Sequence, residues 1–226
     1  MPRPRFQKLA PEKRARILET AAREFAAHGF EAASLNHILA AAGISKGAAY
    51  YYFDDKADLF AAVIEHYWQR VLGTIDLDFA ARDASTFWSK THELYHRALD
   101  DAYEQPWLLP LFKSFWGRAQ STGLPKPMAD QFAALITWLR GFVERGREIG
   151  AIRSDLPLDL LLALMTAADD ACDRWLIENW DRLERPEVER ITHAVFDGVR
   201  RMVEPPPRDP AAACGGPARG GSPKSP

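Results

Sequence analysis

The spacing of apolar residues is the feature that most limits how this chain can fold. Over most of its 226 residues, apolar side chains recur three and four positions apart, and the strict alternation of a half-buried strand is rare. Prolines and glycines interrupt this pattern at places where helices would begin or end. The spacing therefore predicts an all-α fold.

These interruptions divide the chain into expected helices. A first helix is predicted over about 12–28, followed by Gly29, a residue that favours the left-handed backbone found just after a helix. Two short helices follow, one capped by Ser34 and running to about 42, the other capped by Ser45 and running to about 53, with a turn at Gly43. Longer helices are expected from about 55 to beyond 71 and over about 84–104, 107–119, 126–149, 157–180 and 186–203.

Composition excludes several classes of protein. With 47% hydrophobic and 27% charged residues, the chain has the make-up of a globular protein. No apolar run approaches the ~18 residues of a membrane span, and the N-terminus lacks the apolar stretch of a signal peptide, so a cytoplasmic protein with no membrane partner is expected. The two cysteines, Cys172 and Cys214, are too few for a disulfide framework or a cysteine-rich zinc site, and neither a metal nor a cofactor is predicted.

The net charge of −2 is the sum of two parts of the chain that carry opposite charge. Through Phe53 the chain has eight basic and four acidic residues, a charge of +4, so the remainder carries −6. A basic head on an acidic body favours a polyanion as the partner of the head, although many helical surfaces carry such asymmetry without binding anything. Charge alone leaves both interpretations open.

Residues 34–53 read SLNHILAAAGISKGAAYYYF and fit two short helices joined by a glycine turn. In a helix-turn-helix, such a pair crosses steeply and buries one face of each helix. The positions expected to pack inward are Ile38, Ala42, Ile44, Ala49 and Tyr52. A reader of the DNA major groove needs small residues and hydrogen-bond donors on its outer face. Here that face would carry Lys46, Gly47, Ala48, Tyr50 and Tyr51.

The stretch over 42–59 reads AGISKGAAYYYFDDKADL, and residues 25–30 before it read FAAHGF. This sequence resembles the DNA-binding head of the TetR family of transcriptional repressors, whose members share the pattern A-G-[VI]-S-x-G-x-x-Y-x-Y-F-x-x-K-x-x-L. Every fixed position of that pattern is filled. Agreement over about 50 residues is far more specific than a lone short motif. The resemblance ends near residue 70.

The start of the second short helix offers several kinds of DNA contact. Ser34 and Ser45 place hydroxyls at helix starts, where free N–H groups also favour a phosphate, in addition to their role as N-caps. Lys46 can reach a guanine edge or a phosphate, and Gly47 lets the backbone approach the duplex. Ala48 could touch a thymine methyl group.

Two tyrosines and a lysine complete the predicted DNA contacts. Tyr50 and Tyr51 present hydroxyls to the phosphate backbone, and the corresponding residues of the family are usually phosphate or groove contacts. Lys56 resembles the family's phosphate-clamping lysine; the alternative is a solvated lysine beside Asp54 and Asp55. The predicted DNA-binding set is Ser34, Ser45, Lys46, Gly47, Ala48, Tyr50, Tyr51 and Lys56.

The resemblance implies a body that dimerises and binds a small molecule, which alters the spacing of the two heads. Two heads on a twofold axis would read a palindromic operator and combine their binding free energies. The helices expected over about 157–180 and 186–203 are the predicted dimer faces. The apolar stripe of the second helix could equally form an intrachain core, and it comprises Val188, Ile191, Val195, Phe196, Val199 and Met202.

The effector site is predicted in the body, which holds all seven tryptophans between residues 67 and 180. The helix from 157 places Asp169 and Asp173 four positions apart on one face, and such carboxylates need a partner, water or a ligand. One interpretation is a cationic or donor-rich effector held by aromatic rings and a carboxylate. The predicted effector-site residues are Trp116, Trp138, Met165, Asp169 and Asp173.

The alternative for the two aspartates is structural. They could form ion pairs with Arg174, Arg145 or Arg147, or belong to a polar seam of the dimer.

The predicted function is that of a ligand-responsive dimeric transcriptional regulator, with repression as the family norm. Its expected partners are a double-stranded DNA operator, a small-molecule effector and a second copy of the chain. The alternative is an all-α enzyme or small-molecule-binding protein that uses the aromatic body. His92 and His96 lie four apart with Glu93 between them, but no HExxH order, nucleophile elbow or phosphate loop occurs. The histidines are interpreted as surface or core residues, and no enzyme is expected.

The chain is predicted to have three parts. Residues 1–55 would form a three-helix helix-turn-helix DNA-binding head, and residues 56–204 a helical body for effector binding and dimerisation. Residues 205–226 are rich in proline, glycine, alanine and serine, which bury too little surface to order a chain, so a disordered tail is expected.

Overall fold

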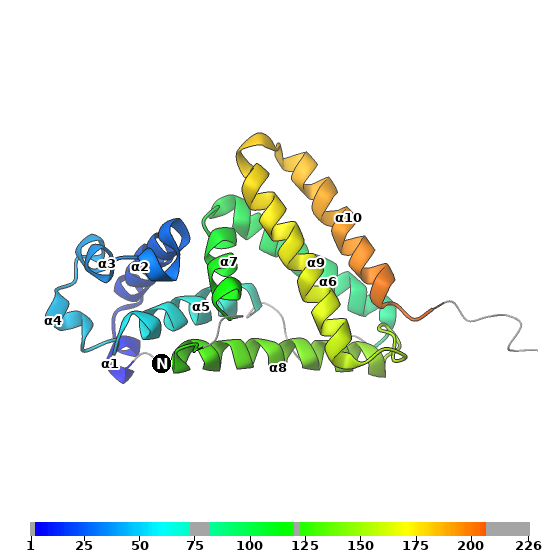
Figure 1. Ribbon diagram of the computed structural model, residues 1–226, viewed down its shortest axis with the longest axis horizontal. Helices are drawn as coiled ribbons and strands as arrows, with labels where there is room; N and C mark the ends of the chain where they lie inside the picture. Colours follow the sequence, from blue (N-terminus) through cyan, green and yellow to red (C-terminus); the bar gives the residue numbers. More distant parts are fainter. Residues whose placement is uncertain (1–2, 73–81, 120–122, 207–226) are drawn as a thin grey trace, which may run out of the picture.

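The computed structural model describes residues 3–72, 82–119 and 123–206, and within these ranges all regular structure is helical (Figure 1). The all-α prediction is confirmed. The helices are α1 (Pro4–Gln7), α2 (Pro11–Ala32), α3 (Leu35–Ala42), α4 (Lys46–Ala49), α5 (Lys56–Leu72), α6 (Ala84–Glu104), α7 (Leu108–Ala119), α8 (Lys126–Glu148), α9 (Leu158–Asn179) and α10 (Arg185–Val203), with a 3₁₀ turn at Trp180–Arg182.

Most helix ends lie within a residue or two of their predicted positions, because caps and breakers act locally. The first long helix, α2, breaks at Gly29, which has a φ of 70°, and then continues for less than one turn to Ala32. Gly43, with a φ of 69°, ends α3 in the left-handed conformation. An alanine at either glycine would be strained because L residues rarely adopt this backbone.

Two elements differ from the prediction. Helix α1 was not expected, because a four-residue segment carries no periodicity to detect. Helix α4 ends at Ala49 rather than near 53. The N–H groups of Tyr51 and Tyr52 bond to carbonyls three residues back, which tightens the chain into turns, and the carbonyl of Tyr52 accepts from the N–H of Arg3. The tertiary contact with the N-terminal segment therefore accompanies the early end of the helix.

One apolar core runs from the head into the body. Phe25 of α2 packs edge-on against Phe60 of α5 with ring centres 4.8 Å apart, and Phe60 lies 6.3 Å from Phe115 of α7. All three rings are buried. The apolar core is therefore continuous across the predicted boundary after residue 55, because Phe60 of α5 packs against both α2 and α7.

The far end of the body consists of α6, α9 and α10, with α9 and α10 packed side by side (Figure 1). Val188 of α10 is buried with Leu99 of α6 and Leu176 of α9, and Phe196 of α10 packs against Trp88. These two residues of the predicted α10 stripe therefore contribute to an intrachain core. Among the described helices, none is long and apolar enough to cross a membrane. The predicted tail lies outside the described residues from 207 onward.

Candidate DNA-binding and effector sites

The two serines predicted as N-caps occupy those positions. The Ser34 hydroxyl accepts a hydrogen bond from the N–H of His37 at 3.3 Å, and the Ser45 hydroxyl accepts one from the N–H of Ala48 at 3.2 Å. Both serines are exposed. Capping fixes where α3 and α4 begin, and the remaining N–H groups of each first turn point outward.

The outer face of α4 and the turn after it is open. Lys46 and Gly47 are exposed, and a Cβ added at Gly47 would meet no atom within 4 Å. Tyr50 and Tyr51 expose 50% and 57% of their surface, unusual for aromatic residues in a folded chain. Ala48 is half-buried. The structure thus brings the five predicted outward residues onto one accessible segment.

Lys56 has a structural role that the sequence did not reveal. Its ammonium donates to the main-chain carbonyls of Glu31 at 2.9 Å and Ala33 at 3.1 Å, and it lies 4.8 Å from the ring centre of Phe30. These carbonyls are at the C-terminal end of α2, where the helix dipole favours a cation. Lys56 therefore caps α2 and holds it to the start of α5, and a phosphate contact by this residue stays a prediction.

An N-terminal segment that sequence reasoning did not place packs behind the two tyrosines. Phe6 is buried and its ring lies 4.7 Å from that of Phe53. Arg3 donates to the carbonyl of Tyr50 at 2.7 Å and to Asp54 at 2.9 Å, and the Arg5 guanidinium lies 5.2 Å from the ring centre of Tyr51. The basic charge of the first residues was the only sequence signal for this contact.

Glu24, on α2, is a further residue that the sequence analysis missed. Its side chain is only 8% exposed and accepts a hydrogen bond from the N–H of Ser34 at 2.9 Å. Burial alone would raise the pKa of this carboxyl, but the hydrogen bonds from Ser34 and His37 hold the pKa below its ordinary value. Glu24 is therefore ionised at neutral pH and anchors the start of α3.

The aromatic residues predicted for the effector site are divided between two parts of the core. Trp116 packs against Phe132 with ring centres 5.7 Å apart, whereas Trp138 packs against Trp68 at 6.1 Å and Phe142 at 5.9 Å. The indole Nε1 of Trp138 is buried and has no hydrogen-bond partner among the described residues. Such a donor is costly to bury unless something binds it.

Met165 joins the same apolar cluster as Trp138, but the two aspartates lie elsewhere on α9. Asp169 is exposed and Asp173 half-buried. Partial burial, followed by repulsion from Asp169 and Asp170, raises the pKa of Asp173 to about 7. The charge of Lys113 opposes the shift at Asp173.

The three arginines considered as partners of these aspartates bind other groups. Arg174 pairs with Asp170, Arg145 pairs with Glu148, and Arg147 donates to two main-chain carbonyls. Within the described ranges, neither Asp169 nor Asp173 forms an ion pair. The predicted pairing with Arg174, Arg145 or Arg147 is therefore wrong.

A small hollow lies between α5, α7 and α8, with a volume of about 10 Å³, room for roughly one water molecule. Five of its six lining residues are apolar or aromatic and one is an amide: Ile64, Trp68, Phe112, Phe115, Gln131 and Leu135. None of the five predicted effector residues lines it, although Trp138 contacts Trp68. The sequence could not locate this hollow, because helical periodicity does not distinguish a cavity wall from core.

Comparison with known proteins decides the family. A sequence profile described as "Bacterial regulatory proteins, tetR family" matches residues 17–63, which span α2 to α5. The HTH-type transcriptional repressor SCO4008 of Streptomyces coelicolor is 30% identical over 199 residues, which cover 84% of this chain and 91% of that protein. The chain belongs to the TetR family. It is accordingly a DNA-binding transcriptional regulator with a helix-turn-helix head.

Other transcriptional regulators differ in how much of this chain they match. The regulator AcrR of Shigella flexneri is 38% identical, but over 73 residues that cover 32% of this chain and 34% of that protein. Among solved structures, the transcriptional regulator FadR from Bacillus subtilis, in complex with stearoyl-CoA, has a TM-score of 0.67 at 14% identity and covers 84% of this chain and 99% of that one. The fold is thus shared over most of the chain although sequence identity is low.

Proposed function

We propose that this TetR-family chain is a ligand-responsive transcriptional repressor that binds a palindromic DNA operator as a homodimer. The observation that carries the proposal is the exposed segment formed by Lys46, Gly47, Tyr50 and Tyr51. Tyr50 and Tyr51 expose half or more of their surface beside a cation and a glycine, with only Arg5 lying over the Tyr51 ring, and such exposed aromatic surface suits the edge of a DNA groove.

Dimerisation is proposed through α9 and α10. Leu160 and Trp175 of α9 expose 44% and 43% of their surface, and small residues separate them on the same side of the helix, with Ala167 and Ala171 exposed. Apolar surface of this kind favours a partner, and small residues let helices approach closely. Because one short helix makes few contacts, two heads on a twofold axis supply the affinity and specificity that an operator needs.

The proposed effector is a mainly apolar small molecule that enters between α5, α7 and α8. Support comes from the aromatic lining of the hollow, the unsatisfied N–H of Trp138, and the stearoyl-CoA bound by the FadR structure. The hollow is far smaller than a drug-sized ligand site, so binding would push these helices apart. Ile64 lines the hollow one turn after Phe60, which packs on Phe25 of the head, so α5 would transmit the movement.

The functional division follows from these assignments. Residues 1–55 would read DNA, residues 56–204 would bind the effector and dimerise, and residues 205–226 would form a tail without a core of its own. In this proposal the chain carries out no catalysis and acts in the cytoplasm.

The test is a selection of genomic DNA fragments by the purified chain, followed by binding measurements on the selected sequence at two salt concentrations. We expect a palindromic site, and Tyr50→Phe is expected to weaken binding at least about fivefold by removing a phosphate contact. Tyr103→Phe, on α6, is the matched control and should bind as the unmodified chain. Selection of no common sequence would overturn the proposal.

The effector half of the proposal has its own test. Stearoyl-CoA is added to the protein–operator complex, and release of the DNA is followed together with tryptophan fluorescence. The chain has seven tryptophans, of which Trp68 lines the hollow and Trp138 contacts Trp68. We expect release with a fluorescence change. Replacing Leu135 with tryptophan should fill the hollow and abolish the response while leaving operator binding intact. Release that is unaffected by this substitution would contradict the assignment of the hollow.

A further inference from the structure

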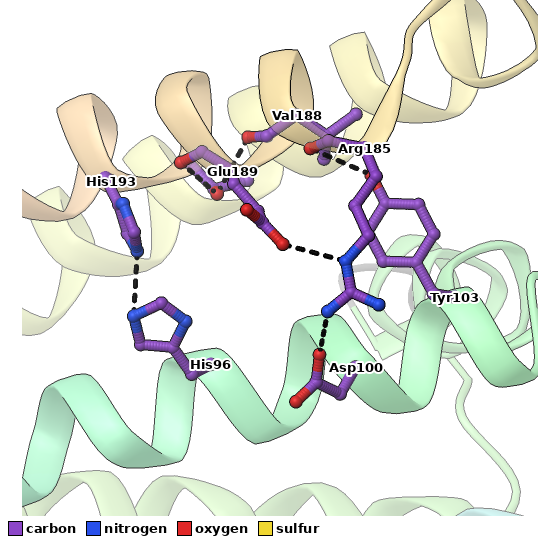
Figure 2. Close-up of polar contacts among 8 residues, drawn as sticks. His96, Asp100, Tyr103, Arg185, Val188, Glu189 and His193 are labelled. Carbon is purple, nitrogen blue, oxygen red and sulfur yellow. Dashed lines mark hydrogen bonds and ion pairs between the residues drawn. The ribbon is translucent and has the colours of Figure 1, made fainter.

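Three histidines meet where α6 packs against α10. His92 and His96 lie one turn apart on α6, and His193 comes from α10, 97 residues further along the chain than His96. Figure 2 shows His96 and His193 pointing toward each other across the gap between the helices, with their Nε2 atoms 2.9 Å apart. One ring nitrogen of each histidine lies within 4.8 Å of the other two.

The arrangement has the size of a metal site. A Zn²⁺–N bond is about 2.0–2.1 Å long, so two nitrogens on a tetrahedral ion are about 3.3 Å apart. The pair formed by His96 and His193 is already slightly closer than that, and His92, with a ring nitrogen within 4.8 Å of both, exceeds the tetrahedral separation by at most about 1.5 Å. Two histidines four apart on a helix, with a third from a facing helix, present their nitrogens to a common point.

The three imidazoles lie in a partly apolar setting. All three rings are half-buried, and Phe196 covers one side with its ring centre 5.3 Å from that of His92.

The charged side chains near the three histidines do not exclude a bound cation. Asp197 lies one turn from His193 on α10, and its charge acts on His92. Arg200 acts in the opposite sense, but its guanidinium is held by Glu204 at 2.6 Å and lies over the ring of Trp88.

Contacts further along α6 and α10 hold these two helices in register before any ion binds (Figure 2). Arg185 of α10 pairs with Asp100 of α6, is held by Glu189 at 2.8 Å, and lies 4.8 Å from the ring centre of Tyr103. Asp100 is four residues after His96, and Glu189 is four before His193. The register of α6 and α10 is therefore set without an ion.

We propose that His92, His96 and His193 bind a divalent transition-metal ion of the zinc class, with a fourth coordination position open to water. Three imidazoles suit Zn²⁺, Ni²⁺ and Co²⁺ rather than Mg²⁺ or Ca²⁺, which prefer oxygen ligands. The ion would link α6 to α10 and stabilise the far end of the body. The site is separate from the helix-turn-helix and from the hollow, so it does not depend on the proposed function.

The test uses the full-length chain without a histidine tag. Co²⁺ is added in steps while visible absorption is recorded, because a low-symmetry Co²⁺ site gives a band whose intensity reports its geometry. We expect saturation at one Co²⁺ per chain, displacement by Zn²⁺, which binds such sites more tightly, and a rise of about 5 °C or more in the melting temperature with excess Zn²⁺.

Variants locate the ion. His193→Gln and His92→Gln, made separately, are each expected to weaken Co²⁺ binding at least about tenfold, since each removes one ligand. His28→Gln is the matched control, because His28 is exposed on α2, and it should bind as the unmodified chain. Circular dichroism identifies a variant that does not fold. No band at a one-to-one ratio, or equal binding by the folded His92 variant, would overturn the proposal.

Discussion

The carboxylate of Glu24 on α2 holds the imidazole of His37 on α3, with Glu24 Oε2 2.6 Å from His37 Nδ1. Because a carboxylate only accepts hydrogen bonds, the ring nitrogen is the donor. The other oxygen of Glu24 accepts from the N–H of Ser34, the N-cap of α3. A single buried side chain thus ties the first helix of the helix-turn-helix to the helix behind it.

Replacing Glu24 with glutamine is expected to lower the free energy of unfolding by about 1–3 kcal/mol, because the buried amide has only one acceptor oxygen for the two donors of Ser34 and His37. Operator affinity should fall as well, since α3 loses its anchor. Urea denaturation and operator titration measure the two effects. Glu19→Gln, in an exposed ion pair with Arg23 on the same helix, should cost less than about 0.5 kcal/mol.

The same contact predicts a pH dependence. The hydrogen bonds from Ser34 and His37 hold the pKa of Glu24 below its ordinary value in the folded chain, so the ionised carboxylate contributes its full stabilisation above the ordinary pKa and loses it as the pH falls through the lowered one. The stability difference between the unmodified chain and Glu24→Gln should therefore be largest near pH 7 and shrink toward pH 3. A difference that does not change with pH would contradict an ionised Glu24.

The same substitution should affect a different property at each of two lysines, namely stability at Lys56 and operator binding at Lys46. Lys56→Met is expected to lower stability by about 1–2 kcal/mol, because the carbonyls of Glu31 and Ala33 lose their donor. Lys46→Met should leave stability unchanged, since the side chain is exposed, but weaken operator binding and reduce its salt dependence by about one phosphate contact per head. Thermal unfolding and a salt series separate these effects.

Phe6 is expected to matter for DNA binding although it lies outside the helix-turn-helix. Phe6→Ala removes a buried ring that packs on Phe53 and should lower the free energy of unfolding by up to about 3 kcal/mol. Because the same segment holds Tyr50 and Tyr51 in place, operator affinity should fall too. Phe6→Leu, which keeps most of the buried volume, should retain both properties.

Trp175 tests the proposed dimer face. Trp175→Glu places a charge on an exposed apolar position of α9, which a monomer tolerates but a buried interface does not. We expect a monomer in sedimentation measurements and a loss of at least tenfold in operator affinity. The exposed Glu178, one turn away, gives the matched control Glu178→Gln, which should remain dimeric. A dimeric Trp175→Glu protein would place the interface elsewhere.

Asp173 is expected to destabilise the folded chain at neutral to alkaline pH. Its pKa is raised to about 7, so the folded state favours the protonated carboxyl, and stability falls as the pH rises from about 4 toward 7. Asp173→Asn should raise the melting temperature at pH 8 by about 2 °C or more, with the gain vanishing at pH 4. Asp181→Asn, at an exposed aspartate outside α9, is the control and should change little.

The helices of this chain could be predicted from local patterns in the sequence. Apolar periodicity located α2 and α5 to α10, and Ser34, Gly43 and Ser45 marked the ends of the two short helices, because caps and left-handed glycines act within a few residues. The pattern around Lys46 and Tyr50 also predicted which residues face outward from this short segment, and the structure leaves Lys46, Gly47, Tyr50 and Tyr51 exposed.

Tertiary structure alone decided which distant residues meet. Lys56 faces main-chain carbonyls of α2, Arg3 reaches Tyr50, and His193 joins His96 across 97 residues. The periodicity of a helix shows that one face is buried but not which other helix covers it. Metal ligands, buried acceptors and cavity walls depend on which helices pack together, because each needs atoms from two elements within a few ångströms. Only the packing of the whole chain fixes such distances.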